Sequence, residues 1–223
     1  PAGEGEDNFT FELQLLKNCK QVNFLYNLNK KLVVDPEALY VSFPFELQEG
    51  KIYFDVPGGT IEAVKEQIPG SVNDWMQLGN INLGRFKKGA LPESNHIFSW
   101  PMNNYWVTNF DAFQFGEFSW SYYLTSSGDA SVEQATKFAW SNRIPLQNRV
   151  FSAGVEKPNP AFGGSIISIQ PTNILLVNMK PIKEEDALLL QIREISGRET
   201  TIELSSAFRR KLKVSESNLS GDV

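Results

Sequence analysis

A strict alternation of apolar and polar residues is the feature that most constrains the fold of this chain. In its clearest instance, the run 118–124, every second residue is large and apolar: Phe118, Trp120, Tyr122 and Leu124. Successive side chains of a β-strand point to opposite faces, so this spacing predicts a strand with one aromatic and one polar face. Further short strands are predicted at 51–56, 166–169, 174–177, 188–192 and 201–204.

Turn-forming residues separate the predicted strands. Pro57-Gly58-Gly59 is predicted to end the strand at 51–56, because proline gives no ladder donor and glycine allows positive φ. Short strands at regular intervals joined by tight turns predict an all-β fold. We expect a large antiparallel β-sandwich whose last third is a meander. The other turns are predicted at 126–129, 170–173, 183–186 and 196–197.

One short helix is predicted, at about residues 131–141. The residues from Ser131 to Gln134 have the form of a capping box, and Pro145 ends the helix. Its apolar residues recur on one helical face: Val132, Ala135, Phe138 and Ala139.

Length and composition limit the remaining choices. A chain of 223 residues fits one large β domain or two small ones, and the absence of a repeat or clear linker favours a single domain over 1–223. The net charge of -5 gives no reason to expect a nucleic-acid partner. No apolar run reaches the roughly 18 residues of a membrane span, so no membrane contact is expected. Cys19 is the only cysteine, which leaves the compartment open. The polar residues 1–8 resemble a linker, and we expect the chain to be a piece of a longer polypeptide.

The run 96–110 combines aromatic side chains with three asparagines and has no charged residue apart from an ionisable His96. Aromatic faces stack on the C–H faces of sugars, and amides pair with hydroxyl groups, so this composition is typical of a carbohydrate site. The alternative is a core strand whose asparagines cap neighbouring turns. Composition alone leaves both interpretations open.

The motifs of common catalytic sites are absent. The chain has no phosphate-binding glycine loop, no paired cysteines and no nucleophile elbow, and His96 is its only histidine. A metal site built from imidazoles is therefore excluded. A glycosidase pair of carboxylates can come from distant positions, which the sequence leaves open. We expect no catalytic residue, no metal site and no glycosidase turnover in this chain.

Several blocks of sequence resemble the C-terminal β domain of family 38 glycoside hydrolases, the α-mannosidases, particularly the long bacterial-type members. The resemblance covers roughly residues 35–204, and its most specific block is Met-Asn-Asn-Tyr-Trp at 102–106. The other blocks follow in the expected order: 38–45, 57–59, 67–71 with Asp74-Trp75, Thr108-Asn109, and 178–181 leading to Glu194 and Gly197.

This resemblance implies a supersandwich of the galactose-mutarotase-like kind. The zinc ion and the nucleophilic Asp of such enzymes belong to an N-terminal barrel that nothing here matches, so this chain would hold no cofactor. Its expected partners are a mannoside and the N-terminal catalytic domain of the same polypeptide. The expected substrate-binding residues come from the run at 96–110 and from the block before it: Asp74, Trp75, Asn103, Asn104, Tyr105, Trp106 and Asn109.

Two departures from the family pattern qualify this assignment. Only two residues separate Trp75 from Leu78, where roughly another hairpin is expected, and Gln191 stands where the family often has an arginine, with Arg193 displaced. The alternatives are an independent carbohydrate-binding module, a mutarotase-like or epimerase-like sugar enzyme, and a purely structural domain.

Overall fold

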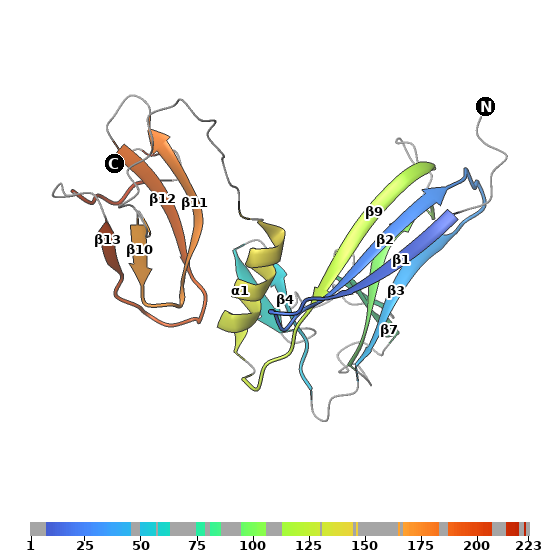
Figure 1. Ribbon diagram of the computed structural model, residues 1–223, viewed down its shortest axis with the longest axis horizontal. Coiled ribbons are helices and arrows are strands. Elements are labelled where there is room, and N and C mark those ends of the chain that lie inside the picture. The colour runs from blue at the N-terminus through green and yellow to red at the C-terminus, as the bar shows by residue number, and fades with distance from the viewer. Residues whose placement is uncertain are drawn as a thin grey trace. The chain divides into compact units, whose positions relative to one another are not determined.

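The computed structural model describes the chain in segments (Figure 1). These are residues 8–45, 50–56, 58–62, 75–78, 81–85, 95–105, 113–129, 131–144, 146, 165, 167–182, 187–206, 213–218 and 221, with the backbone alone at 75–78, 81–85 and 95. The described part is mostly β-structure with one helix, as predicted. The contacts of the chain fall into two units, residues 1–129 and 130–223, and each unit is described by itself. The single domain spanning 1–223 stays a prediction.

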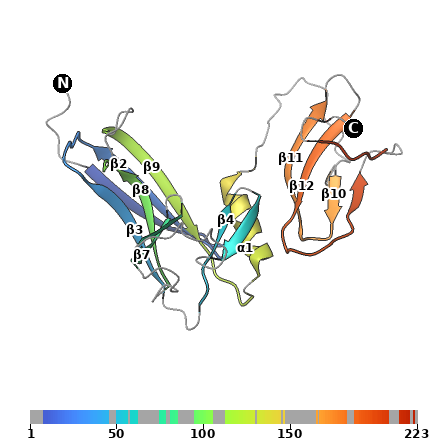
Figure 2. The ribbon, with the colours of Figure 1, turned by 180° about the vertical axis from the view of Figure 1, so that it is seen from behind.

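Unit 1 contains a three-stranded antiparallel sheet in the order β1-β2-β9 (Figures 1 and 2). The predicted alternation at 118–124 is confirmed, because the apolar residues of β9 are half-buried while Ser119, Ser121 and Tyr123 are exposed. The pairing keeps one register along each strand and places Tyr26 opposite both Phe11 and Trp120. The strands span Asn8–Leu15 (β1), Val22–Lys30 (β2) and Gly116–Leu124 (β9).

A second antiparallel sheet of unit 1 has the order β3-β8-β7-β6, and a separate hairpin joins β4 to β5. A register shift opposite Tyr40 marks a bulge in β8, because Trp100 and Pro101 stand against that single residue of β3. The predicted alternation at 51–56 is confirmed, since Phe54 and Val56 are half-buried and Tyr53 is exposed. These strands span Ala38–Phe45 (β3), Tyr53–Val56 (β4), Gly59–Glu62 (β5), Trp75–Leu78 (β6), Ile81–Arg85 (β7) and Asn95–Asn103 (β8).

Aromatic rings connect the two larger sheets of unit 1. The ring of Phe43 on β3 lies 6.2 Å from that of Phe24 on β2 and 5.0 Å from that of Tyr122 on β9. The Tyr122 hydroxyl donates a hydrogen bond of 2.7 Å to Ser99 on β8. Burial raises the pKa of Tyr122, and the bond to Ser99 opposes that shift. The aromatic face that the alternation predicted therefore forms the contact between these sheets.

The helix α1 of unit 2, Val132–Arg143, confirms the prediction at 131–141 and extends it by two residues. The Ser131 hydroxyl accepts a hydrogen bond from the backbone N–H of Gln134 at 3.4 Å, which is the bond expected of an N-cap. Glu133 and Lys137, one turn apart, form an ion pair of 2.6 Å. Within the described ranges, no helix is long and apolar enough to cross a membrane.

The strands of unit 2 pair as nested hairpins, so the predicted meander is wrong. β11 pairs with β12, whereas β10 pairs with β13 in a separate two-stranded sheet. The backbone N–H of Ile195 donates to the carbonyl of Asn173 at 3.0 Å, which ties together the two corners where the chain changes sheets. The strands span Ile167–Gln170 (β10), Ile174–Ile182 (β11), Ala187–Glu194 (β12) and Glu203–Ser206 (β13).

Candidate functional site

The end of β8 brings three of the predicted site residues together, namely Asn103, Asn104 and Tyr105. Asn103 is the last residue of the strand and lies opposite Ala38 of β3. Both asparagines line a cavity of about 160 Å³. Its other lining residues come from β2, β3, β8 and nearby segments: Leu28, Lys30, Val33, Glu37, Ala38, Leu39, Met102 and Gln114.

Asn104 is buried, with 7 % of its surface exposed, and its side chain bonds to the backbone before β3. Its Oδ1 accepts a hydrogen bond of 2.6 Å from the N–H of Glu37. Its Nδ2 donates to the carbonyls of Val33 and Asp35 at 3.1 and 2.9 Å. The polar atoms of this amide are thus used inside the protein, which avoids the cost of about 1–3 kcal/mol for an unpaired buried group. Asn104 shapes one wall of the cavity by holding residues 33–37 against β8.

Asn103 is half-buried and keeps one amide group for other partners. Its Oδ1 accepts a hydrogen bond of 3.2 Å from the backbone N–H of Tyr105. In the part of the chain that the structure describes, Asn103 Nδ2 has no acceptor. An Asn side chain has two N–H donors, so this group can donate to a ligand that enters the cavity.

Three aromatic rings gather where β3 and β8 meet. The Trp100 ring is stacked on that of Tyr40 at 5.5 Å and 14°, and it lies 5.9 Å from the ring of Tyr105. Trp100 is 8 % exposed, whereas Tyr40 and Tyr105 are 41 % and 47 % exposed. Burial and a hydrogen bond between the two tyrosine side chains raise the pKa of Tyr40. Two exposed phenol rings are therefore held in place over a buried indole.

Tyr40 was not among the site residues predicted from the sequence. It lies on β3 between Leu39 and Val41, opposite the bulge of β8, where the register between the two strands shifts. A bulge re-aims side chains relative to regular alternation. Tyr40 lies within the block at 38–45 that the sequence analysis singled out. The apolar and polar alternation of this strand does not reveal the bulge.

An ion pair at the cavity joins Lys30 to Glu37. Lys30 Nζ also donates a hydrogen bond of 3.1 Å to the carbonyl of Lys31. The two opposite charges lie on the cavity lining beside the neutral amide of Asn103. Because they compensate each other, this wall suits a neutral polar ligand better than an ion.

The structure does not describe the side chains of the other predicted site residues. Trp75 opens β6 and pairs with Arg85 of β7, and its backbone alone is described. Asp74, Trp106 and Asn109 lie outside the described residues. Their contribution to a carbohydrate site stays a prediction.

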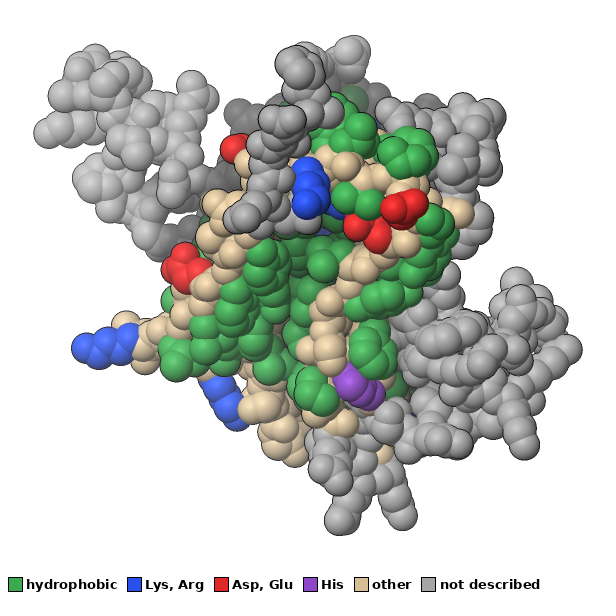
Figure 3. Space-filling model, turned by 90° about the vertical axis from the view of Figure 1, so that its right-hand side faces the viewer, with side chains coloured by type: hydrophobic (Ala, Val, Ile, Leu, Met, Phe, Trp, Pro, Cys, Tyr) green, Lys and Arg blue, Asp and Glu red, His purple; other side chains and the backbone are tan. Residues whose placement is uncertain are grey.

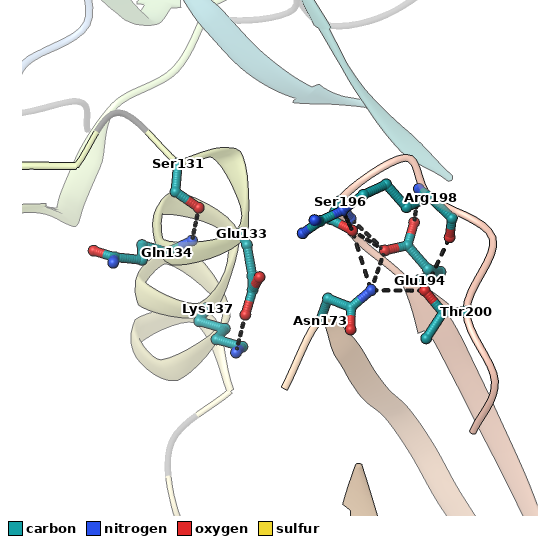
Figure 4. A network of polar contacts seen from close by, with 9 residues as sticks. All are labelled: Ser131, Glu133, Gln134, Lys137, Asn173, Glu194, Ser196, Arg198 and Thr200. Atoms are coloured by element: carbon teal, nitrogen blue, oxygen red, sulfur yellow. Dashed lines mark hydrogen bonds and ion pairs between the residues drawn. The ribbon is translucent and has the colours of Figure 1, made fainter. Parts of the chain in front are cut away.

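A second polar cluster lies in unit 2 around Glu194 (Figure 4). Its Oε1 accepts hydrogen bonds from Asn173 Nδ2 at 2.6 Å, from the N–H of Ser196 at 2.7 Å and from the Ser196 hydroxyl. Its Oε2 accepts from the N–H groups of Gly197 and Arg198 at 2.7 and 3.1 Å. These donors, the Ser196 hydroxyl foremost, lower the pKa of Glu194 to about 2.

The Glu194 cluster explains a block that the sequence singled out. Gly197 has a φ of +71°, which favours glycine, and its N–H is one of the donors to the carboxylate. The guanidinium of Arg193 lies 5.8 Å from the ring centre of Trp140 on α1. The arginine that is displaced relative to the family pattern thus contacts the helix.

Among the described residues, no three His, Cys, Asp or Glu side chains gather to hold a metal ion. No family model matches the chain, and neither the curated proteins nor the solved structures include a significant match to it.

Proposed function

We propose that this chain is the non-catalytic C-terminal β domain of an α-mannosidase-like glycoside hydrolase, and that the end of β8 contacts carbohydrate. One observation carries the proposal: two residues at this end, only two positions apart, give an available amide on the cavity wall, Asn103, and an exposed ring, Tyr105. The blocks of sequence that resemble family 38 support the choice of a mannoside.

The chemistry of the site suits a sugar. Hydroxyl groups both donate and accept hydrogen bonds, so Asn103 Nδ2 can donate to one of them. The faces of Tyr40 and Tyr105 offer surfaces for the apolar side of a pyranose ring. The cavity of about 160 Å³ is smaller than the roughly 300–1,000 Å³ of pockets for drug-sized ligands. It fits a single sugar-sized group.

The remaining parts of the proposal concern the parent protein. The zinc ion and the nucleophile would belong to an N-terminal catalytic domain outside this sequence, on which the chain would lie. The finer fold, a supersandwich of the galactose-mutarotase-like kind, is supported by the contacts of Phe43 with Phe24 and Tyr122 between the two sheets of unit 1.

Titration of the chain with methyl α-mannoside, followed by amide NMR shifts, tests the proposal. We expect shifts in the amides of residues 102–105, and weaker ones with methyl α-galactoside. Tyr105→Ala should weaken binding at least about fivefold, because half-exposed ring surface then no longer covers the sugar. Tyr123→Ala is the matched control, since Tyr123 is a 38 % exposed tyrosine on β9.

The proposal fails if the mannoside shifts no amide near 102–105, or if Tyr123→Ala weakens binding as much as Tyr105→Ala does. Saturable binding by the chain alone with an affinity typical of lectins would favour the independent carbohydrate-binding module.

A further inference from the structure

Strand β1 is an open edge with an apolar row along it. In the described part of the chain its one hydrogen-bonded neighbour is β2, because the sheet order is β1-β2-β9. The two strands pair over all eight residues of β1 without a register shift. Proteins usually protect such an edge with proline, lysine, a bulge or a covering segment. β1 has no proline, no lysine and no bulge, and Glu12 is its only charged residue.

The apolar row consists of every second residue of β1, and it remains accessible. Phe9, Phe11, Leu13 and Leu15 are exposed by 50, 50, 52 and 74 %. Phe11 also touches the aromatic rings of β2, with its centre 4.9 Å from that of Tyr26. The row therefore continues the aromatic face of the sheet out to its edge. Figure 3, which views the side of the molecule with the N-terminal strands, shows hydrophobic side chains filling a hollow there.

We propose that the free edge of β1 binds an extended polypeptide strand that has apolar residues at every second position and a lysine or arginine opposite Glu12. The unpaired N–H and C=O groups of an edge repeat along a strand with the same period as the apolar row. A strand added in register satisfies both features at once. A helix would cover the row and leave the edge groups without backbone partners.

A second copy of this chain fits the edge less well. An antiparallel register that keeps both apolar rows on one face pairs seven of the eight residues of β1 with its copy and places Glu12 opposite either a second Glu12 or Thr10, so neither register gives Glu12 an opposite charge. Like charges directly opposite destabilise a strand pair. The accessible area of the row is on the order of 350 Å². Two copies would thus bury roughly 700 Å² through it, below the roughly 1,200 Å² of a stable interface.

Charge complementarity therefore selects the partner. Glu12 is exposed on the polar face of β1, where its carboxylate accepts a hydrogen bond of 2.8 Å from Gln14 Nε2. A cation on the added strand would lie directly across from it. An opposite-charge pair at such a position strengthens pairing, while a glutamate there weakens it.

A synthetic peptide based on β2 provides the probe. β2 already pairs with β1 antiparallel and places Leu25 opposite Glu12, so its sequence with lysine at that place has the required alternation and charge. We expect saturable binding to the full chain, with new hydrogen-exchange protection in alternate amides of β1. Two control peptides carry either glutamate in place of that lysine or N-methyl groups on the edge-facing amides.

Two variants of the chain make the test specific. Phe11→Ser should weaken binding of the lysine peptide about tenfold, because the exposed half of the Phe11 ring is then no longer buried on binding. Glu12→Lys should weaken binding of the lysine peptide about two- to fivefold and strengthen binding of the glutamate peptide by a similar factor. Tyr123→Ser, on the polar face of β9, is the control and should leave binding unchanged.

Equal binding of the lysine and N-methylated peptides would overturn the proposal, because strand addition requires the edge amides. The proposal would also be overturned if the Glu12→Lys variant kept the preference for the lysine peptide over the glutamate peptide. This comparison tests the proposal even if Phe11→Ser does not fold. Sedimentation that shows a dimer of the chain dissociated by the lysine peptide would assign the edge to a second copy instead.

Discussion

Replacement of Asn104 by alanine separates a structural role of this residue from a ligand-binding one. The change removes three hydrogen bonds, from the N–H of Glu37 and to the carbonyls of Val33 and Asp35. Each such bond contributes about 1 kcal/mol net, and a buried group left unpaired costs about 1–3 kcal/mol. Water can reach part of the loop, because Asp35 is exposed and the cavity adjoins Val33. We therefore expect a loss of about 2–3 kcal/mol in the free energy of unfolding.

Thermal and urea denaturation of unit 1 measure this loss, which corresponds to a fall of about 6–12 °C in Tm. Asn103→Ala is the matched control, since it removes one hydrogen bond to the backbone and should cost less than about 1 kcal/mol. Asn104→Asp should also destabilise, because a carboxylate would then face the Val33 and Asp35 carbonyls. If Asn104→Ala unfolds within about 0.5 kcal/mol of the wild type and loses mannoside binding instead, the reasoning about Asn104 is refuted.

Three further outcomes are expected. The Glu194 pKa of about 2 lies below its ordinary value of 4.5, so its contribution to stability is present above about pH 4.5 and lost as the pH falls toward 2. The gap in urea midpoint between wild type and Glu194→Gln should therefore close over that range, and a constant gap would contradict this. Ser131→Ala should destabilise α1 by about 1 kcal/mol, measured by hydrogen exchange of its first turn. Tyr122→Phe removes the hydrogen bond to Ser99 and should cost about 0.5–1.5 kcal/mol in thermal unfolding, and no change would mean that water replaces the phenol.

The local structure of this chain follows from its sequence because its signals are local. The alternation around Trp120 spans one strand, and the bond between Ser131 and Gln134 lies within one helical turn. Both depend on residues only a few positions apart, so period and capping rules suffice to find them.

Strand pairing and the site depend on contacts that no local pattern encodes. The pairing of β10 with β13 encloses a complete hairpin, and the alternation of each strand is the same in a meander or a nested arrangement. The three bonds of Asn104 reach residues about seventy positions away. The sequence left open whether the asparagines of this segment contact sugar or bond to neighbouring turns, and Asn104 bonds to the backbone of residues 33–37.

The Glu194 cluster also limits how this part of the chain can vary in length. The carboxylate reaches the N–H groups of Ser196, Gly197 and Arg198 because they follow it at fixed positions. One extra residue between Glu194 and Gly197 would move those N–H groups away from the carboxylate oxygens of Glu194. It would also disturb the hydrogen bond that Asn173 donates to this carboxylate from the other corner. The Arg198 side chain also contributes, because its Nε donates a hydrogen bond of 3.1 Å to the Ser196 hydroxyl oxygen. Insertions and deletions in relatives of this chain should therefore avoid this corner, and glycine should persist at position 197, where φ is +71°.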